Sequence, residues 1–397
     1  MASIEQYEIK NGRKLWRVQY RTPAGKPTTK RGFKTKRAAS DWADENAHTM
    51  KTGGYVAPSA GRLAFETFAE TWFAGKVNLA ASTRARYRGV LDTHLIPEFG
   101  TAKLADITHE LIQEWVATSA TKSTPGTVRK NMTVLNQVLA EAVRRRRIAV
   151  NPATDIELPR SVHVERRYLT AAQAAALAKA AGTVTADATK IGEKRYAAQL
   201  NAADARRTLV YVLAYTGLRF GEAAALSVAD VNVLRSRLRV HRSVTQVNGE
   251  MVYGSTKTGK ARDVAVPKFL LDMLKEAIDG RAPHELVFPA ANGEPLRLRN
   301  VRRDWWNRAV KDSGVPSGLT PHELRHTAAA LAIRAGASVK AVQRMLGHAS
   351  ATLTLDLYGH LFEDELDNVA DRLDAHFAEA SAAECSREEV AKLRVAR

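Results

Sequence analysis

Residues 320–360 carry, within one short stretch, the side-chain types that phosphodiester chemistry needs when no metal is used. A guanidinium group holds two phosphate oxygens at once, an imidazole donates hydrogen bonds or shuttles protons, and a phenol oxygen can attack as a nucleophile. A further arginine, Arg219, lies upstream in Thr216–Glu222. The set predicts breakage and rejoining of a nucleic acid backbone. The segments are Thr320–Thr327 with His322, Arg325 and His326, then Leu346–Gly347–His348, and Leu357–His360 with Tyr358.

The pattern His322–His326 also matches the H-E-x-x-H zinc motif, in which both histidines ligate the metal and Glu323 is the general base. Arg325, between the two ligands, would oppose a bound cation. The zinc hydrolase interpretation also leaves Arg219 and Tyr358 without a role. We therefore favour phosphate chemistry and expect no metal and no other cofactor.

The local sequence predicts how the phosphate-binding residues are displayed. Thr320, Pro321 and Glu323 form a capping box with a proline start, so a helix is predicted from Pro321. His322 and Arg325 would then share the first helical turn, where free backbone N–H groups attract anions.

Two other positions have more than one interpretation. Arg219 and Glu222 are three residues apart in a segment that reads as a helix, so they could form a surface ion pair. The apolar run 209–218 favours a buried helix instead, in which Glu222 or a phosphate is the arginine's partner. Lys257 and Lys260 flank a tight β-turn, and either could deliver a proton to a leaving oxygen.

Composition agrees with a polyanionic partner. The 397 residues include 60 Lys and Arg against 42 Asp and Glu, a net charge of +18, which favours DNA or RNA over a membrane surface. The one cysteine, Cys385, excludes a disulfide framework and a cysteine metal site within one chain. The polar N-terminal stretch and the lack of an apolar run near ~18 residues predict a cytoplasmic protein.

The periodicity predicts a multidomain chain that is mainly α with small β-sheets. Residues 1–55 read as three strands (7–9, 15–20 and 28–33) and a helix (36–50), leaving one basic sheet face open. After a linker at 56–63, residues 64–152 read as four helices: 65–73, one capped by Ser82, 104–120 and 127–147. Residues 153–168 read as a second linker.

The third domain is predicted over 169–380, followed by a tail at 381–397. It opens with a capping box of Thr170 and Gln173. Strands follow near 237–244, 251–254 and 262–267, with Asn248-Gly249 as a hairpin turn. An acidic helix over 361–380 carries an apolar stripe of Phe362, Leu366, Val369, Leu373 and Phe377.

In order and spacing, Thr216–Glu222, Lys257, His322–Thr327, Leu346–His348 and Tyr358 resemble the tyrosine recombinase family, with the phage-type integrases of actinobacterial phages as the nearest likeness. The resemblance implies an arm-site DNA-binding domain at 1–55, a helical core-site DNA-binding domain at 64–152 and an α+β catalytic domain at 169–380.

The resemblance also implies a role for each motif residue. Tyr358 would form a 3′-phosphotyrosine, Arg219 and Arg325 would clamp the phosphate, and Lys257 would protonate the 5′-oxygen. His322 and His348 would assist by hydrogen bonding and proton transfer, with Glu222 and His326 as supporting residues. A DNA-binding regulator that has the fold but no catalysis is the alternative.

The partners that the resemblance implies are double-stranded DNA with core-type and arm-type attachment sites, and a homotetramer on that DNA. A host DNA-bending protein and an excision factor would assist, and the protein would associate with the bacterial nucleoid. The acidic helix would pack on an adjacent protomer. The basic side chains that we expect on DNA in the first two domains are Arg17, Arg21, Lys30, Arg31, Lys34, Arg84, Arg129 and Lys130.

Overall fold

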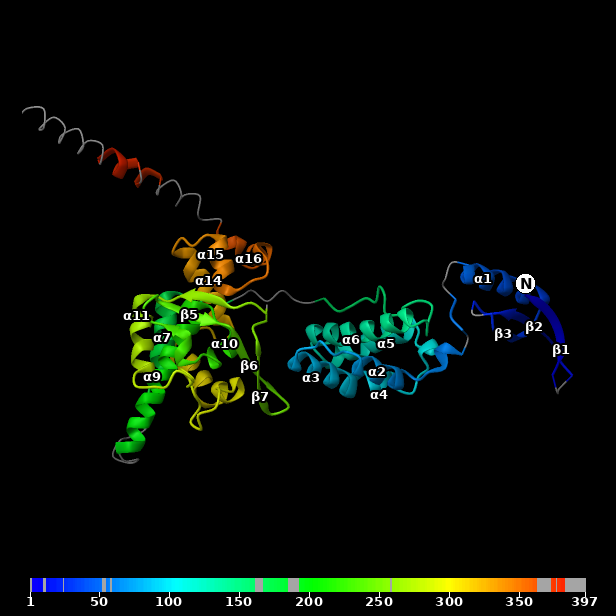
Figure 1. Ribbon diagram of the computed structural model, residues 1–397, viewed down its shortest axis with the longest axis horizontal. Helices are drawn as coiled ribbons and strands as arrows, with labels where there is room; N and C mark the ends of the chain where they lie inside the picture. The colour runs from blue at the N-terminus through cyan, green and yellow to red at the C-terminus, as the bar shows by residue number, and fades with distance from the viewer. Residues whose placement is uncertain are drawn as a thin grey trace, which may run out of the picture. The chain divides into compact units, whose positions relative to one another are not determined.

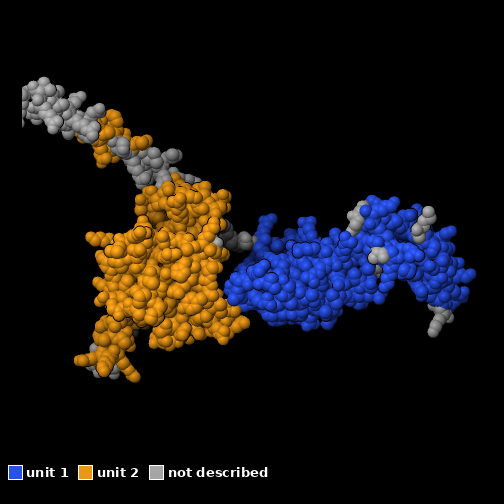
Figure 2. Space-filling model, in the orientation of Figure 1, with its two compact units in different colours: residues 1–163 blue, residues 164–397 orange. Residues whose placement is uncertain are grey.

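The computed structural model describes residues 2–9, 12–23, 25–51, 55–57, 59–160, 167–184, 193–257, 259–362, 373–375 and 377–382. The chain divides into two compact units, residues 1–163 and 164–397 (Figure 2). The predicted class is confirmed, because helices dominate and every described sheet is small and antiparallel (Figure 1). None of the described helices combines the length and the apolar character that a membrane span requires.

The predicted N-terminal sheet is confirmed, in the order β1 (Ser3–Glu8), β2 (Lys14–Arg21), β3 (Pro27–Phe33). Alternate residues of β2, Val18 and Tyr20, are buried with Ala39 and Ala43 of helix α1 (Lys36–Lys51) in one apolar cluster. This alternation leaves the opposite face of β2 without a covering helix. Asn11, in the predicted first hairpin turn, lies outside the described residues.

The rest of the first unit is helical, with a core formed by one face of each helix, including Phe65, Trp72 and Leu135. The predicted start at Ser82 is wrong, because that helix begins at Ala81 without a side-chain cap. The predicted start at Leu104 is also wrong, since Leu104–Asp106 is a separate 3-10 turn and Thr108 caps the helix. The elements are α2 (Phe65–Ala74), α3 (Ala81–Val90), the π-helical turn η2 (Leu91–Leu95), α4 (Ile96–Phe99), α5 (His109–Lys122) and α6 (Pro125–Arg144).

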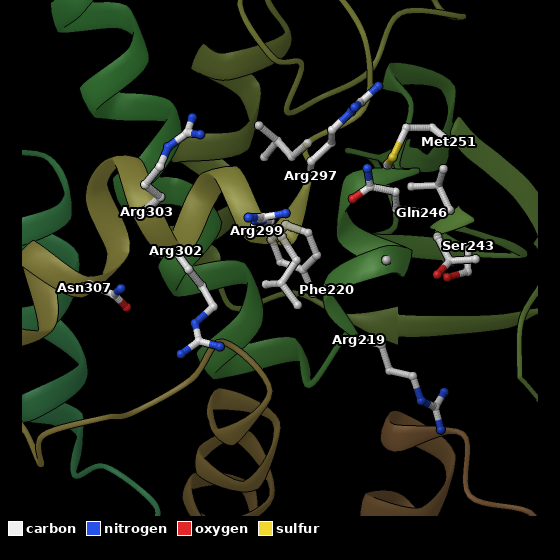
Figure 3. A pocket seen from close by; sticks show the side chains of 15 residues that line it. Arg219, Phe220, Ser243, Gln246, Met251, Arg297, Arg299, Arg302, Arg303 and Asn307 are labelled. Atoms are coloured by element: carbon white, nitrogen blue, oxygen red, sulfur yellow. The ribbon is translucent and has the colours of Figure 1, made fainter. Parts of the chain in front are cut away.

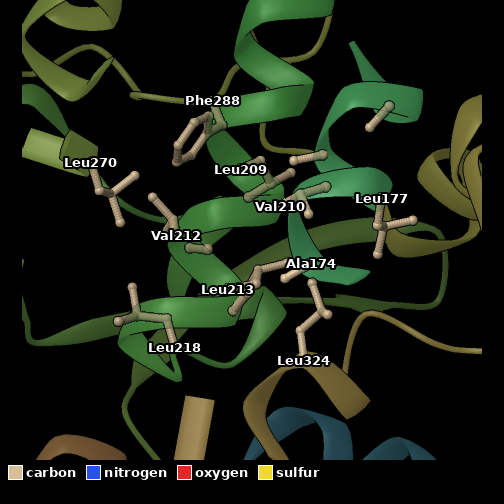
Figure 4. Close-up of a cluster of buried hydrophobic side chains, with 14 of the residues drawn as sticks. Ala174, Leu177, Leu209, Val210, Val212, Leu213, Leu218, Leu270, Phe288 and Leu324 are labelled. Carbon is tan, nitrogen blue, oxygen red and sulfur yellow. The ribbon is translucent and has the colours of Figure 1, made fainter. Parts of the chain in front are cut away.

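The second unit is built around helix α9 (Glu193–Thr216), which contacts α7 (Ala171–Ala181) and α14 (Glu323–Arg334). Leu209 and Leu213 of α9 meet Leu177 and Leu324 in a buried cluster (Figure 4). The predicted capping box of Thr170 and Gln173 is present at the start of α7. The other helices up to residue 278 are the short α10 (Phe220–Ala224) and α11 (Lys268–Ile278).

Five strands of the second unit form two sheets. The strand predicted over 237–244 is wrong as one element, because it breaks at His241 between β5 (Arg237–Val240) and β6 (Arg242–Val247). Strand β5 lies between β4 (Val231–Asn232) and β8 (Arg262–Ala265), whereas β6 pairs with β7 (Glu250–Ser255). Asn248 and Gly249 turn this hairpin with φ of 50° and 90°, as the Asn-Gly pattern predicts.

The remaining described elements include α14 with α15 (Val339–Leu346) and α16 (Ala351–Tyr358), which Figure 1 shows together at one end of the second unit. Of the predicted acidic helix, 373–375 and 377–382 are helical, and Leu373 and Phe377 are exposed. Leu366, Val369 and Cys385 lie outside the described residues. Before α14 come α12 (Leu298–Val301), the π-helical turn η5 (Arg302–Trp306) and α13 (Asn307–Asp312).

Candidate active site

Arg219 lies in the connection between α9 and α10, and its backbone is extended (φ −68°, ψ 148°). The prediction that Arg219 is within a helix is therefore wrong. Gly217 follows the last residue of α9 and has a φ of +65°, a backbone conformation that residues with a side chain disfavour. A Cβ at Gly217 would lie 2.5 Å from the Leu346 side chain, so the connection packs directly against α15.

Glu222 is buried, with 1% of its surface exposed, so the Arg219–Glu222 pair is not a surface ion pair. The Glu222 carboxylate accepts hydrogen bonds from Arg219 through Nη1 at 3.0 Å and the backbone N–H at 2.9 Å. It also accepts two from Arg262, at 3.1 and 2.6 Å. Burial alone raises the pKa of Glu222, but the Arg262 hydrogen bond and the charges of both arginines outweigh it, so the pKa is lowered. Glu222 is therefore ionised and fixes both guanidinium groups.

Arg325 is 4% exposed and lies in the first turn of α14. Its guanidinium donates Nη1 to the Gly217 carbonyl at 2.6 Å and Nη2 to the Leu346 carbonyl. These bonds join the Arg219 connection to the C-terminal end of α15. Burial, and then the charge of Arg219, lower the pKa of Arg325 to about 9, which leaves it protonated at neutral pH.

Helix α14 begins at Glu323, two residues after the predicted start, with His322 as its N-cap residue. The Glu323 carboxylate accepts from the Thr320 N–H at 2.6 Å and from the Thr320 hydroxyl at 3.0 Å, so this half of the predicted capping box exists. Pro321 and His322 form a turn before the helix, because the backbone N–H of Glu323 bonds the Thr320 carbonyl at 2.9 Å.

His322 and His348 both have positively charged side chains nearby. His348 follows Gly347, and its Nδ1 lies 3.0 Å from the Thr354 hydroxyl. Burial and then the charges of neighbouring arginines lower the pKa of His348 to about 4. The pKa of His322 is lowered by burial and by the charges of Arg325, Arg219 and Lys257. Each imidazole is therefore neutral at pH 7 and carries one N–H donor.

Tyr358 ends α16 and is 2% exposed. Its hydroxyl lies 2.8 Å from His326 Nδ1, and its ring stacks parallel to that of His348 with centroids 6.4 Å apart. The phenol therefore lies between two imidazoles, and His326 directly follows Arg325 on α14.

Lys257 follows β7 in a turn held by two hydrogen bonds: Thr256 Oγ1 to the Lys260 carbonyl, and Gly259 N–H to the Thr256 carbonyl, each 2.8 Å long. Lys257 is among the charges that lower the pKa of His322, whereas Lys260 is not. This electrostatic contact favours Lys257 over Lys260 as the lysine of the site. Thr258 lies outside the described residues.

Arg262 of β8 is a site residue that sequence reasoning missed. Besides Glu222, it contacts the Met345 carbonyl through Nε at 3.1 Å. Arg262 and Arg325 thus bind successive carbonyls at the end of α15, where the helix dipole is negative. A single arginine in a strand gives no sequence signal of this role.

The proposed zinc ligands do not form a metal-binding cluster. The rings of His322 and His326 are 5.7 Å apart, and His326 Nδ1 is engaged with Tyr358. Within the described part of the chain, no group of three or more His, Cys, Asp or Glu side chains is placed to hold a metal ion.

A basic hollow of about 850 Å³ begins at Arg219 (Figure 3). One wall is β6 from Ser243 to Gln246, and Phe220, Met251 and Leu296 add apolar surface. Four arginines that were not predicted as site residues line the other wall, on α12, the residue before it and η5. They are Arg297, Arg299, Arg302 and Arg303.

The predicted DNA-contacting residues of the N-terminal sheet do not share one face. Arg17 and Arg21 alternate with the buried Val18 and Tyr20 and so face away from α1, and Arg31 pairs with Arg17 across the sheet. Arg17 also forms an ion pair with Glu5 at 2.8 Å. Lys30 pairs with Val18, which places it on the α1 side of the sheet. Lys34 follows β3 and is exposed.

The predicted contacts of the helical domain are exposed. Arg84 donates to the Lys76 carbonyl at 3.0 Å, and its guanidinium lies 4.6 Å from the Phe73 ring. Arg129 donates Nε and Nη2 to the Pro159 carbonyl at 3.2 and 3.0 Å. Lys130 is exposed beside it on α6.

Two family models match the chain. Residues 168–365 match the phage integrase family, and residues 64–118 match the N-terminal SAM-like domain of phage integrases. The putative prophage phiRv2 integrase of Mycobacterium tuberculosis is 26% identical over 358 residues, covering 86% of this chain and 87% of the relative. The integrase of Mycobacterium phage D29 is 28% identical over 305 residues, 75% of each chain.

Solved structures share the fold. The Tn1549 transposon integrase in complex with transposon right end DNA superposes with a TM-score of 0.63 at 21% identity, covering 79% of this chain and 100% of the other. A lambda integrase dimer bound to a COC′ core site gives a TM-score of 0.54 at 21% identity, covering 89% and 93%.

Proposed function

Since this chain belongs to the phage integrase family of tyrosine recombinases, we propose that it is a site-specific DNA recombinase that integrates and excises a mobile element. The observation that carries the proposal is the buried Tyr358 hydroxyl, 2.8 Å from His326, whose neighbour Arg325 bonds the connection that holds Arg219. This arrangement offers a nucleophile and a phosphate clamp together.

The charges of the site suit a phosphodiester. Arg219, Arg262 and Arg325 contribute three positive charges, and Glu222 contributes one buried negative charge. The neutral His322 and His348 add hydrogen-bond donors without adding charge. The excess positive charge binds the monoanionic phosphodiester and stabilises the additional charge that develops in the pentacoordinate transition state.

In the proposed reaction, Tyr358 Oη bonds to phosphorus while the bond from phosphorus to the 5′-oxygen breaks. Lys257 gives its proton to that oxygen, leaving a 5′-hydroxyl and a 3′-phosphotyrosine. Arg219 and Arg325 hold the non-bridging oxygens, and His322 and His348 donate hydrogen bonds to them. The phosphotyrosine conserves the bond energy, so a 5′-hydroxyl from a second strand restores the phosphodiester without ATP.

DNA next to the scissile phosphate is proposed to lie along the basic hollow. Four arginines line one wall, and Arg219 at its end joins the hollow to the active site. Such a wall neutralises backbone phosphates, which fixes the position of the duplex without reading its sequence. Arm-type sites are assigned to residues 1–55 and core-type sites to residues 64–152.

We propose a tetramer on two DNA sites as the working assembly, in the host cytoplasm at the nucleoid. A lambda integrase tetramer bound to a Holliday junction shares this fold, with a TM-score of 0.53 and 21% identity. A host DNA-bending protein and an excision factor would set the direction of the reaction.

Covalent capture tests the proposal. Wild type and Tyr358→Phe are incubated in EDTA with a supercoiled plasmid library of DNA from the host and its mobile elements. The reaction is stopped with detergent, and protein-linked DNA is recovered and sequenced. We expect wild type to link to one recurrent sequence and Tyr358→Phe to bind DNA without linking. A binding protein without catalysis would give no linked DNA from either, and linkage by Tyr358→Phe would remove Tyr358 from its role.

A further inference from the structure

The Tyr358 hydroxyl must lose its proton when it attacks phosphorus. None of the roles proposed for the other site residues includes accepting that proton. Lys257 supplies a proton to the other side of the phosphate, so it is not available as an acceptor in the same step. The contact that bears on this question is between Tyr358 Oη and His326 Nδ1, at 2.8 Å. That distance is within the reach of direct proton transfer.

The two side chains are held together by rigid elements. His326 lies on α14 directly after Arg325, and Tyr358 is the last residue of α16. Their ring centroids are 5.7 Å apart, with the planes tilted by 56°. Tyr358 belongs to a buried cluster with Ala329 and Ile333 of the same α14 helix, so packing fixes the phenol against the imidazole.

The negative charge of a bound phosphodiester makes His326 a better proton acceptor. In the free protein, the positive charge of the adjacent Arg325 opposes a positive charge on the His326 imidazole. A phosphodiester held by Arg219 and Arg325 offsets that charge. Proton acceptance by His326 is therefore favoured once DNA is in place, which couples activation of the nucleophile to substrate binding.

We propose that His326 is the general base that activates Tyr358, an inference that rests on the proposed function. With its proton on Nε2, the imidazole accepts the phenol proton at Nδ1 as Oη bonds to phosphorus. The bond to the 5′-oxygen breaks, and Lys257 protonates that oxygen. In rejoining, the attacking 5′-hydroxyl returns a proton to Lys257, and the imidazolium of His326 returns one to the departing Tyr358 oxygen.

The test compares His326→Asn with His326→Leu on a nicked duplex of the DNA sequence captured by wild type. The asparagine Oδ1 lies near the position of Nδ1, so it accepts the hydrogen bond but takes no proton near neutral pH. Single-turnover formation of the covalent adduct is followed from pH 5 to 9. We expect both variants to be slower than wild type by about 100-fold or more at pH 7.5.

The pH profile separates a base from a positioning residue. Wild type should lose rate as the pH falls and the imidazole gains a proton, whereas both variants should lack this acid limb. Added imidazole should accelerate His326→Ala but not Tyr358→Phe. Adduct formation by His326→Asn within about threefold of wild type would reduce His326 to a positioning residue and overturn the proposal.

Two controls distinguish a specific effect at His326 from a general effect of the substitution on folding or DNA binding. His284→Asn places the same substitution at an exposed histidine far along the chain from α14, and should cut like wild type. The thermal unfolding midpoint and the DNA affinity of each variant are measured, and imidazole rescue of His326→Ala decides if His326→Asn does not fold. An absence of adduct with wild type would reject the proposed function itself. If wild type forms the adduct and His326→Asn forms it equally fast, only the general-base role of His326 is rejected.

Discussion

Arg219 and Arg325 hold their guanidinium groups in different ways. Arg219 is fixed by the ionised Glu222, whereas Arg325 is fixed by neutral carbonyls of Gly217 and Leu346. A planar guanidinium with five donors keeps several N–H groups for a ligand after making such bonds, whereas a lysine ammonium has only three donors in all. Both arginines are therefore fixed in advance for the phosphate that we propose they bind.

Replacing either arginine by lysine keeps the positive charge but removes the planar guanidinium group, so it tests the contribution of the bidentate geometry. Arg219→Lys and Arg325→Lys should each slow covalent adduct formation by about 100-fold or more, because the bidentate clamp on the transition state is lost. DNA binding should change little, since many other cations contribute to it. Single-turnover assays at saturating protein measure the first effect and gel-shift assays the second. Adduct rates near wild type would contradict the clamp role.

His348 should make stability depend on pH. Its pKa is lowered to about 4 in the folded protein, so the unfolded chain binds the proton more readily. The resulting stabilisation is present above the unfolded pKa of about 6.5 and is lost as the pH falls toward about 4. His348→Gln cannot titrate, so its free energy of unfolding should fall less between pH 7 and 4.5 than that of wild type. Equal losses in urea titrations would contradict this.

The prediction of the site from sequence succeeded where spacing along the chain carries the information. Thr320–Thr327 predicted a helix start, and the structure moves that start by two residues, which keeps Arg325 in the first turn but puts His322 outside the helix, at its N-cap. Arg262 could not be predicted, because its partners Glu222 and Met345 are distant in sequence. The sheet face that Lys30 occupies could not be predicted either, because pairing register, and not composition, decides which face a side chain occupies.

At the level of elements, the strand β8 and the helices α10 and α15 meet at Arg262. Its guanidinium contacts the Glu222 carboxylate and the Met345 carbonyl, which joins all three. The break between β5 and β6 at His241 was not predicted, because both halves have the same alternating pattern and differ only in which strand they pair with.

Removing Arg262 should destabilise the second unit. Arg262→Met leaves the buried Glu222 carboxylate without its closest partner, a change that costs about 3 kcal/mol when a buried ion pair is broken. Adding Glu222→Gln removes the unpaired charge and should recover part of this loss. Denaturant unfolding of the single and double variants measures both effects. A loss below about 1 kcal/mol for Arg262→Met would show that the pair does not hold these elements together.

The stability of the second unit should depend on glycine at position 217 for two reasons, the positive φ and the lack of space for a side chain. Gly217→Ala adds strain at φ +65° and a clash with Leu346, together about 2–4 kcal/mol. Gly249→Ala is the matched control, because Gly249 also has positive φ (+90°) but open space where the Cβ would lie. It should cost only about 1 kcal/mol. Similar losses in thermal unfolding for both variants would contradict the predicted clash.

At the scale of the whole molecule, the first unit contains two separate apolar clusters. The cluster around Val18 and Tyr20 contains only residues from 4–57, and the cluster around Phe65 and Leu135 only residues from 63–158. The domain boundaries that we propose follow these clusters. The charge and composition of the sequence predicted a DNA partner, but they could not indicate the arginine-lined hollow, which forms only when α12, η5 and β6 meet.

Deleting residues 1–60 should leave the remaining chain able to cut its core-type site. The same deletion should abolish high-affinity binding to distal arm-type sites, because the basic face of β2 and β3 is removed. Footprinting on the complete attachment site and adduct assays on the core site measure the two effects. Unchanged protection of distal sites would assign arm binding to another part of the chain.

The bonds of Arg325 have a consequence for the growing polypeptide on the ribosome. Its two acceptors lie 108 residues earlier and 21 residues later in the chain, and Tyr358 follows both. The proposed clamp and nucleophile can therefore come together only after Tyr358 has left the exit tunnel. A nascent chain that has folded only the proposed DNA-binding domains would occupy DNA but could not break it. Premature termination before residue 325 would thus yield a competitor of the complete protein and not a nuclease.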